Sequence, residues 1–241
     1  MSVVHSADHE AELLAEFEEL VETGQLIGQG HVFMQQMTVM VDRFMATGEL
    51  AVAEDPFGGA DMRRMLDAEA YYLMFWRMFD RTPASAMQDF AIKVRRILAK
   101  RIMKRVGEGV IFHQDVFILS GRNIELGDGV FVNRGATLDD RGPIIVDDHT
   151  MIAAGATITT HGHVLDDFTQ PMPFGGRTMA PVKIGNNTVI GYNSVIMSGV
   201  TVGDRVIVAA NSVVTHDVDD RWIVGGVPAK KIKQLVPRAG G

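Results

Sequence analysis

The chain has 241 residues, of which 46% are hydrophobic and 22% charged, and its formal net charge is −7. This composition is that of an ordinary globular protein with a substantial core, in one domain or two. The negative charge argues against broad nucleic-acid binding. No apolar run approaches the roughly twenty residues of a membrane span, and the N-terminus does not read as a secretory signal. We therefore expect a cytoplasmic protein without a membrane span.

Cysteine is absent from the sequence. Disulfides, thiolate metal ligands and a cysteine acyl-enzyme are thereby excluded. Basic residues are unevenly spread, since none precedes Arg43, whereas the segment from Arg221 to the end carries five of them and no acidic residue. A basic tail on an acidic protein suits a small anionic ligand better than a polyanion.

The first hundred residues show helical periodicity. Apolar residues recur at helical spacing in three stretches, over residues 9–23, 32–45 and 61–79. Ser85 with Gln88 resembles a capping box, and it predicts a fourth helix that runs to about Val106. We expect an α-helical N-terminal region over residues 1–108.

From about residue 110 the helical period gives way to a period of six. One phase holds aliphatic residues, at Ile184, Ile190, Ile196, Val202, Val208 and Val214. Small or β-branched residues follow four positions later, at Thr188, Ser194, Val200, Val206 and Ser212. This period fits neither a helix nor a plain alternating strand, and it is typical of a β-helix whose hexapeptides each form a short strand and a corner.

The same phase extends upstream with two interruptions. One earlier group is Val146, Ile152 and Ile158, and the inserted residues 164–183 lie between this group and Ile184. The group before it is Leu126, Val132 and Leu138, which is offset by two residues around Arg141–Gly142. At about eighteen residues a coil, the hexapeptides predict four or five coils. Helices over one open end and neighbouring subunits along the faces would cover the exposed strand edges.

Three stretches resemble the left-handed β-helix acyltransferases of the hexapeptide-repeat class, and most closely the galactoside, maltose and xenobiotic O-acetyltransferases. They are Asn133–Asp140, Thr160–His163 and Gly225–Ile232. The resemblance implies a mainly β fold, with a left-handed parallel β-helix over residues 109–220, an inserted loop at 164–183 and a C-terminal basic tail at 221–241. The left hand rests on the resemblance alone, because the general crossover preference favours the right hand.

The resemblance implies an acyltransferase that moves an acetyl group from acetyl-CoA to a hydroxyl of a sugar or another small acceptor, without a metal. His163 falls on the Gly-His motif where this family keeps its general base. A neutral histidine, with an ordinary pKa of about 6.5, can take the proton of a hydroxyl as the oxygen attacks a thioester. His161 points the same way if both lie on one strand, and it either orients His163, lines the pocket or only packs.

The resemblance also places acceptor contacts at Asn133 and at the pair Asp139 and Asp140. Amide and carboxylate oxygens accept hydrogen bonds from sugar hydroxyls. For the two aspartates, a turn before Gly142–Pro143 is the competing interpretation.

The donor contacts that the resemblance implies lie further along the chain. Tyr192, Ala210, Thr215 and His216 would line the groove for acetyl-CoA, and the N–H of Tyr192 would also face the thioester oxyanion. The phosphates would meet Lys230 and Lys233, together with Lys231, on the basic tail.

The family implies a homotrimer with active sites shared between subunits. Without cysteine or a G-x-S-x-G motif, direct transfer is favoured over an acyl-enzyme. N-acetylation of an amino sugar or sugar nucleotide on the same scaffold remains open. So do a γ-type carbonic anhydrase-like zinc protein, which needs three properly placed histidines, and a non-catalytic trimeric scaffold, against which the retention of His163 speaks.

Overall fold

The computed structural model describes residues 7–23, 68–166, 168–169, 171 and 176–236. The chain divides into two compact units, residues 1–78 and 79–241. The helix expected over 32–45 and the first part of the one expected over 61–79 lie outside the described residues. Within the described ranges, no helix is long and apolar enough to cross a membrane.

The first unit contains α1 (Ala7–Glu22) and most of α4 (Ala68–Phe79). These helices confirm the helical periodicity of the sequence where the structure describes it. The Tyr72 hydroxyl donates a hydrogen bond to the carbonyl oxygen of Val21 at 3.0 Å. Trp76 is almost fully buried.

The second unit begins with the short 3₁₀ helix η1 (Pro83–Ala86) and with α5 (Gln88–Ile102). The predicted capping box is wrong. Ser85 lies inside η1, where its hydroxyl donates to the carbonyl oxygen of Thr82 at 2.8 Å. The N-cap of α5 is Met87, which makes no side-chain cap. α5 also ends earlier than predicted, at Ile102, and Val106 belongs to the first strand, β1.

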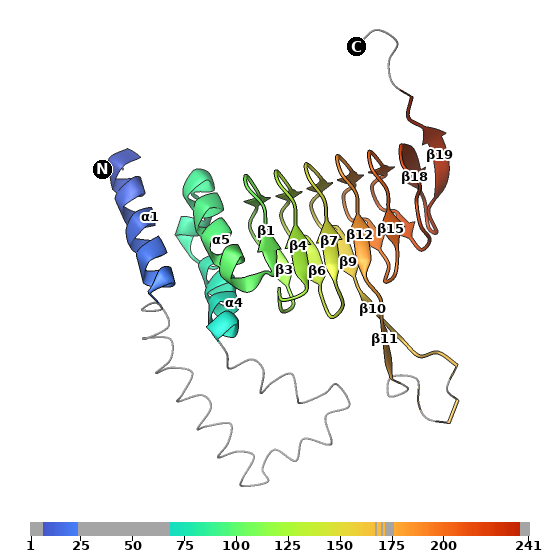
Figure 1. Ribbon diagram of the computed structural model, residues 1–241, viewed down its shortest axis with the longest axis horizontal. Helices are drawn as coiled ribbons and strands as arrows, with labels where there is room; N and C mark the ends of the chain where they lie inside the picture. Colours follow the sequence, from blue (N-terminus) through green and yellow to red (C-terminus); the bar gives the residue numbers. More distant parts are fainter. Residues whose placement is uncertain (1–6, 24–67, 167, 170, 172–175, 237–241) are drawn as a thin grey trace. The chain divides into compact units, whose positions relative to one another are not determined.

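The remainder of the unit is a parallel β-helix of three sheets (Figure 1), which confirms the predicted architecture. Sheet A contains β1 (Arg105–Val106), β4 (Ile124–Leu126), β7 (Ile144–Val146), β12 (Val182–Ile184) and β15 (Thr201–Val202). Sheet B contains β2 (Ile111–Phe112), β5 (Phe131–Val132), β8 (Met151–Ile152), β13 (Val189–Ile190), β16 (Ile207–Val208), β18 (Trp222–Gly225) and β19 (Lys230–Gln234). Sheet C contains β3 (Phe117–Ile118), β6 (Thr137–Asp139), β9 (Thr157–Thr159), β14 (Val195–Ile196) and β17 (Val213–Val214).

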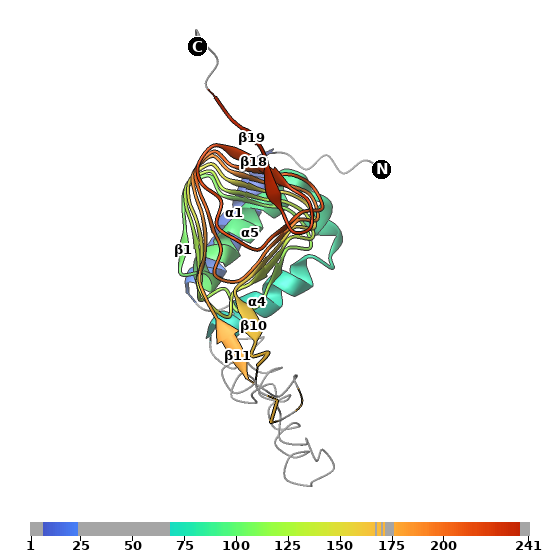
Figure 2. The same cartoon turned by 90° about the vertical axis from the view of Figure 1, so that its right-hand side faces the viewer.

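The chain passes from sheet A to B to C and back to A, so the β-helix has an A–B, a B–C and a C–A edge (Figure 2). Five coils are complete, and a sixth begins where Val218 bridges to Val202. Coil length varies, since Glu125 pairs with Ile145, twenty residues on, whereas Lys183 pairs with Thr201, eighteen residues on. The two additional residues of the early coils lie at the C–A edge, and they account for the offset in the sequence pattern.

The six-residue phase forms the core. Its aliphatic members Ile190, Ile196 and Val208 are all fully buried. The smaller residues four positions later are buried as well, and their hydroxyls are satisfied. For example, the Thr188 hydroxyl donates to the carbonyl oxygen of Gly203 at 2.8 Å. Each of these buried hydroxyl oxygens therefore has a hydrogen-bond partner, which avoids the cost of an unsatisfied buried polar atom.

A ladder of aspartate and asparagine side chains runs along the A–B edge. In each case the Oδ1 atom accepts a hydrogen bond from a backbone N–H of the preceding coil. The acceptors are Asp128, Asp148, Asn186, Asp204 and Asp220, at 2.7–3.2 Å. A Cβ atom on Gly203 would lie 2.3 Å from Oδ1 of Asp220. At this edge the ladder therefore explains the glycine that follows the aliphatic residue of the repeat, at Gly107, Gly127, Gly185 and Gly203.

The first end of the β-helix is covered within the second unit, and at the last end sheet B is extended by an additional strand. At the first end, α5 contacts β1 and β2. A buried ion pair at 2.6 Å joins Arg95 of α5 to Asp80, whose second carboxylate oxygen accepts the N–H of Asp115 from the first coil at 3.0 Å. At the last end, β19 pairs antiparallel with β18. The expected helical cover of one end is thus confirmed for α5, while the division at residues 108 and 220 stays a prediction.

Candidate active site at the C–A edge

Between β9 and β12 the chain leaves the coils as a two-stranded antiparallel ribbon, which projects from the C–A edge (Figures 1 and 2). Its strands are β10 (His161–His163) and β11 (Arg177–Met179). His161 pairs with Met179 and His163 pairs with Arg177. Paired residues and residues two positions apart share one face of such a ribbon. One face therefore carries His161, His163, Arg177 and Met179.

Both ring nitrogens of His161 are engaged. Nδ1 lies 2.9 Å from Oδ2 of Asp139, and Nε2 lies 2.6 Å from Nη1 of Arg141. A carboxylate can only accept and a guanidinium can only donate. The geometry therefore requires a neutral His161 ring whose Nδ1–H donates to Asp139 and whose Nε2 lone pair accepts from Arg141.

The electrostatic surroundings agree with a neutral ring. Burial lowers the pKa of His161, the Asp139 carboxylate raises it, and the charges of Arg141, His163 and Arg177 lower it, so that the net direction is down. Protonation would also place an Nε2–H against the guanidinium of Arg141. His161 is thus held in one tautomer, and its basic lone pair is already in use.

His163 differs from its neighbour. Its side chain is exposed, and its ring lies edge-on to that of His161 with 6.2 Å between centroids, on the side expected from the sequence. Among the described residues, its ring nitrogens have no hydrogen-bond partner. A ring in this position can take a proton from a bound ligand, because no protein group competes for its lone pair.

The two adjacent aspartates at this edge occupy different environments. Asp139 turns Oδ2 to His161, and its Oδ1 is buried without a partner in the described part of the chain. Asp140 is fully buried, and its carboxylate accepts hydrogen bonds from the N–H of Ser120 at 2.9 Å and from the Ser120 hydroxyl at 2.8 Å. Asp140 therefore braces the corner, as the turn interpretation expects, and has no atom available to a ligand.

The B–C edge carries another group of the expected site residues. Asn133 follows β5 there, and its Oδ1 accepts the N–H of Arg134 at 2.7 Å. Tyr192 and Ala210 follow β13 and β16 at the same edge, and both are exposed. In the described ranges, the backbone N–H groups of Tyr192 and Ala210 make no backbone hydrogen bond. Two open donors are thus displayed on an edge other than that of His163.

Thr215 and His216 follow β17 at the C–A edge of the fifth coil, where the Thr215 hydroxyl lies 2.9 Å from Nδ1 of His216. Both side chains are exposed. They belong to the same edge as His163, two coils further along the axis.

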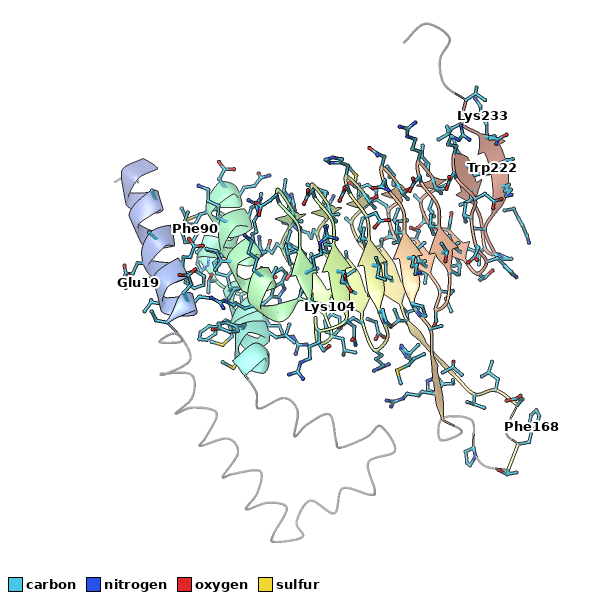
Figure 3. The ribbon with its side chains drawn as sticks, in the orientation of Figure 1. Glu19, Phe90, Lys104, Phe168, Trp222 and Lys233 are labelled. Carbon is cyan, nitrogen blue, oxygen red and sulfur yellow. The ribbon has the colours of Figure 1, made fainter. Side chains whose placement is uncertain are left out.

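The three tail lysines all lie on β19 at the last end of the coils, where Figure 3 labels Trp222 and Lys233. Lys231 forms an ion pair with Asp219 at 2.6 Å and lies 4.7 Å above the Trp222 ring. Lys230 and Lys233 are exposed and, within the described residues, form no ion pair. These two ammonium groups remain available for an anionic ligand.

Sequence reasoning missed Arg141, Arg177 and Met179 as parts of this site. Arg141 stands in the corner that the two-residue offset marks, but nothing in the sequence places its guanidinium against His161. Arg177 and Met179 reach the histidines only through the register of the ribbon. Among the described residues, no group of three or more His, Cys, Asp or Glu side chains could hold a metal ion.

Comparisons with known proteins agree with this architecture. The profile of a family described as "Hexapeptide repeat of succinyl-transferase" matches residues 181–216. Galactoside O-acetyltransferase of Escherichia coli K12 is 31% identical over 147 residues, which cover 61% of this chain and 71% of that protein.

Two solved structures resemble the fold at similar identity. A maltose O-acetyltransferase from Clostridium difficile 630 matches with 30% identity and a TM-score of 0.62, covering 70% of this chain and 87% of that one. A hexapeptide-repeat acetyltransferase from Vibrio cholerae O1 biovar eltor, complexed with acetyl coenzyme A, matches with 26% identity and a TM-score of 0.60, covering 71% and 90%.

The coils of hexapeptides and the histidine ribbon at one edge define a hexapeptide-repeat protein of the parallel β-helix type. With 31% identity across 71% of the Escherichia coli enzyme, the chain belongs to the hexapeptide-repeat acetyltransferase family.

Proposed function

We propose that this protein transfers an acetyl group from acetyl-CoA to a hydroxyl of a sugar or another small acceptor, directly and with His163 as the general base. As a member of this family, the chain is a CoA-dependent acetyltransferase. The hydroxyl as acceptor and the role of His163 as general base are what we propose beyond that activity.

One observation supports His163 over its neighbour. The lone pair of His161 accepts a hydrogen bond from Arg141 at 2.6 Å, whereas the ring of His163 is exposed and unengaged among the described residues. A general base needs a free lone pair within hydrogen-bond reach of the proton that it removes. Of the two histidines, His163 is the one whose lone pair is not already engaged by a described residue.

In the reaction, a ring nitrogen of His163 takes the proton of the acceptor hydroxyl as its oxygen attacks the thioester carbonyl carbon. A carbon–oxygen bond forms, the carbonyl oxygen becomes an oxyanion, and the carbon–sulfur bond then breaks. The departing thiolate recovers the proton from His163, so that the products are an acetyl ester and coenzyme A. The sequence has no cysteine to carry the acetyl group.

The donor would lie partly along the B–C edge, with Thr215 and His216 at the C–A edge as its other expected contacts. The open N–H groups of Tyr192 and Ala210 can donate to amide oxygens of the extended pantetheine arm or to the oxyanion, where fixed donors stabilise developing charge. Lys230 and Lys233 would hold the phosphates as point charges. Asn133, at the same edge, would contact the acceptor.

The positions of these groups support a homotrimer with shared sites. His163 lies at the C–A edge, whereas Tyr192 and Ala210 lie at the B–C edge, so a second copy is needed to bring both sets together. The outward face of sheet B offers an apolar surface for assembly. It consists of one register column, formed by Ile111, Phe131, Met151, Val189, Ile207 and Ile223. Contiguous apolar side chains on a surface often mark a subunit interface.

The proposal is tested by incubating the protein with acetyl-CoA and a panel of hydroxyl- and amine-bearing acceptors, with detection of the free thiol and mass analysis of the products. We expect an O-acetyl product and no acetylated protein in a rapid-quench sample without acceptor. An acetylated protein that reacts on with acceptor would contradict direct transfer. Exclusive N-acetylation would replace the hydroxyl acceptor by an amino sugar.

A further inference from the structure

The C–A edge contains a guanidinium that the proposed reaction does not use. Arg141 lies in the corner between β6 and β7, and its side chain is 31% exposed. Its Nη1 donates to Nε2 of His161 at 2.6 Å. In the described part of the chain, its Nε and Nη2 atoms have no hydrogen-bond partner. Arg141 therefore presents unused donors at a fixed place beside the histidine ribbon.

The orientation of this guanidinium is fixed through the His161 ring, which two neighbours hold in place. Asp139 accepts from Nδ1 of His161 at 2.9 Å and so holds the tautomer whose Nε2 can accept from Arg141. The Thr159 hydroxyl, 3.2 Å from the same Nδ1, also contacts the ring. His161 is thus a positioning residue for Arg141. This use of its ring explains why a histidine that is unsuited to act as the base stands two residues from His163.

Among the described residues, the positive charge of Arg141 is only partly offset. Asp139 lies 3.7 Å from Arg141, and its nearer oxygen is already shared with His161. A second guanidinium, Arg177, stands directly opposite His163 in the ribbon and on the same face. Its positive charge reaches His161, whose pKa burial lowers first and Arg177 lowers further. Arg141 and Arg177 therefore both place positive charge near His161, two residues from His163.

We propose that Arg141, oriented by His161 and Asp139, is an anion-binding subsite beside the histidine ribbon, where the charge of Arg177 adds to the positive potential, so that the preferred acceptor carries a carboxylate or phosphate as well as its reacting hydroxyl. Arginine donors recognise both groups in the same way, through paired N–H bonds to two oxygens. Met179, which is 62% exposed on the same face of the ribbon, would contact the apolar part of such an acceptor. The inference rests on the proposed function and names its substrate class.

The experiment measures acceptor binding without the chemical step. The protein is saturated with coenzyme A, which fills the donor site, and is titrated calorimetrically with glucose, glucuronate and glucose 6-phosphate. We expect the two anionic sugars to bind more tightly than glucose, and their advantage to shrink as salt screens the charges. A carboxylate source and a phosphate source are thereby compared directly.

Variants then assign the effect. Arg141→Gln should weaken binding of the anionic sugars about 10-fold to 100-fold, the effect of losing a charge-assisted hydrogen bond, and should leave glucose unchanged. His161→Ala should weaken the same ligands, whereas His161→Gln, whose amide oxygen can still accept from Arg141, should retain more of the affinity. Arg101→Gln, at an exposed position of α5, is the matched control and should bind like the wild type.

Anionic sugars that bind no better than glucose would overturn the subsite, as would an Arg141→Gln protein with unchanged preference. Weaker binding of coenzyme A itself in Arg141→Gln would assign the arginine to the donor instead. Failure of the proposed function gives a different result, since it would appear as absence of coenzyme A binding or of acetyl transfer in the wild type.

Discussion

The 2.6 Å contact between Nη1 of Arg141 and Nε2 of His161 gives His161 a different role from His163, which is only two residues away. The contact consumes the lone pair of His161 and leaves that of His163 open. It also couples the corner between β6 and β7 to the ribbon that carries both rings.

Acidification should weaken the folded state through His161. Burial lowers the pKa of His161 in the folded protein below its ordinary value of 6.5. Between pH 6.5 and the lower folded pKa, the unfolded chain therefore binds a proton at His161 that the folded chain does not bind. The stability that the neutral ring contributes should therefore be complete above pH 6.5 and decline below it.

Urea unfolding of the wild type and of His161→Gln at a series of pH values would measure this effect. The difference in free energy of unfolding should stay level above neutrality and shrink on acidification. His113, whose pKa burial also lowers, is present in both proteins and cancels. A difference that increases in acid would show that His161 is stabilised in its charged form.

Removal of the unpaired tail lysines should weaken donor binding. Lys230→Ala together with Lys233→Ala should reduce coenzyme A affinity about 2-fold to 30-fold, since an exposed ion pair contributes about 0.2–1 kcal/mol. The loss should diminish at high salt and for 3′-dephospho-coenzyme A. Calorimetric titration checks this, with exposed Lys183→Gln on β12 as control. Equal affinities in all variants would exclude these lysines from the donor site.

Mixed assemblies should reveal a shared site. His163→Ala chains lack the proposed base, and Ala210→Trp chains would block the proposed donor groove. Co-expression of the two should restore part of the activity, because some interfaces of a mixed trimer combine an intact His163 with an intact groove. Sedimentation would establish the mass of the assembly. An active monomer, or mixed assemblies no more active than their parents, would refute sharing.

The ladder at the A–B edge should contribute to stability. Asp204 accepts from the N–H of Asn186 at 2.7 Å, and its removal leaves that donor without its partner. Asp204→Ala should lower the free energy of unfolding by about 1–2 kcal/mol. Asp204→Asn keeps an oxygen in place and should cost much less. If both variants unfold alike in urea, the carboxylate oxygen has no structural part.

The repeat was predictable from sequence because burial imposes it on every coil. Ile190 and Val208 are buried as the six-residue phase requires, and the offset near Arg141 marks the longer coils. The ladder was not foreseen, since a glycine and an aspartate or asparagine at a corner are also what any turn prefers. The pattern at Ser85 and Gln88 was misread, because local spacing cannot show that Ser85 is buried in a 3₁₀ turn beside Gln114.

The candidate site was only partly predictable for a related reason. His163 stands on a recognisable motif, and alternation along a strand places His161 on the same side. The contacts of His161 with Asp139 and Arg141 join consecutive coils, so they depend on coil length and corner shape. The position of Arg177 depends on the register of the ribbon. Neither can be read from one sequence without its fold.

The most direct test of His163 as the general base compares kcat of His163→Ala with that of His161→Ala. Both are measured by thiol release with saturating acetyl-CoA and acceptor. We predict that His163→Ala lowers kcat about 10²-fold to 10⁴-fold, the usual contribution of a general base, with donor affinity retained. His161→Ala should keep most of kcat and lose mainly acceptor affinity. Turnover like the wild type in His163→Ala, with an inactive His161→Ala, would contradict the account.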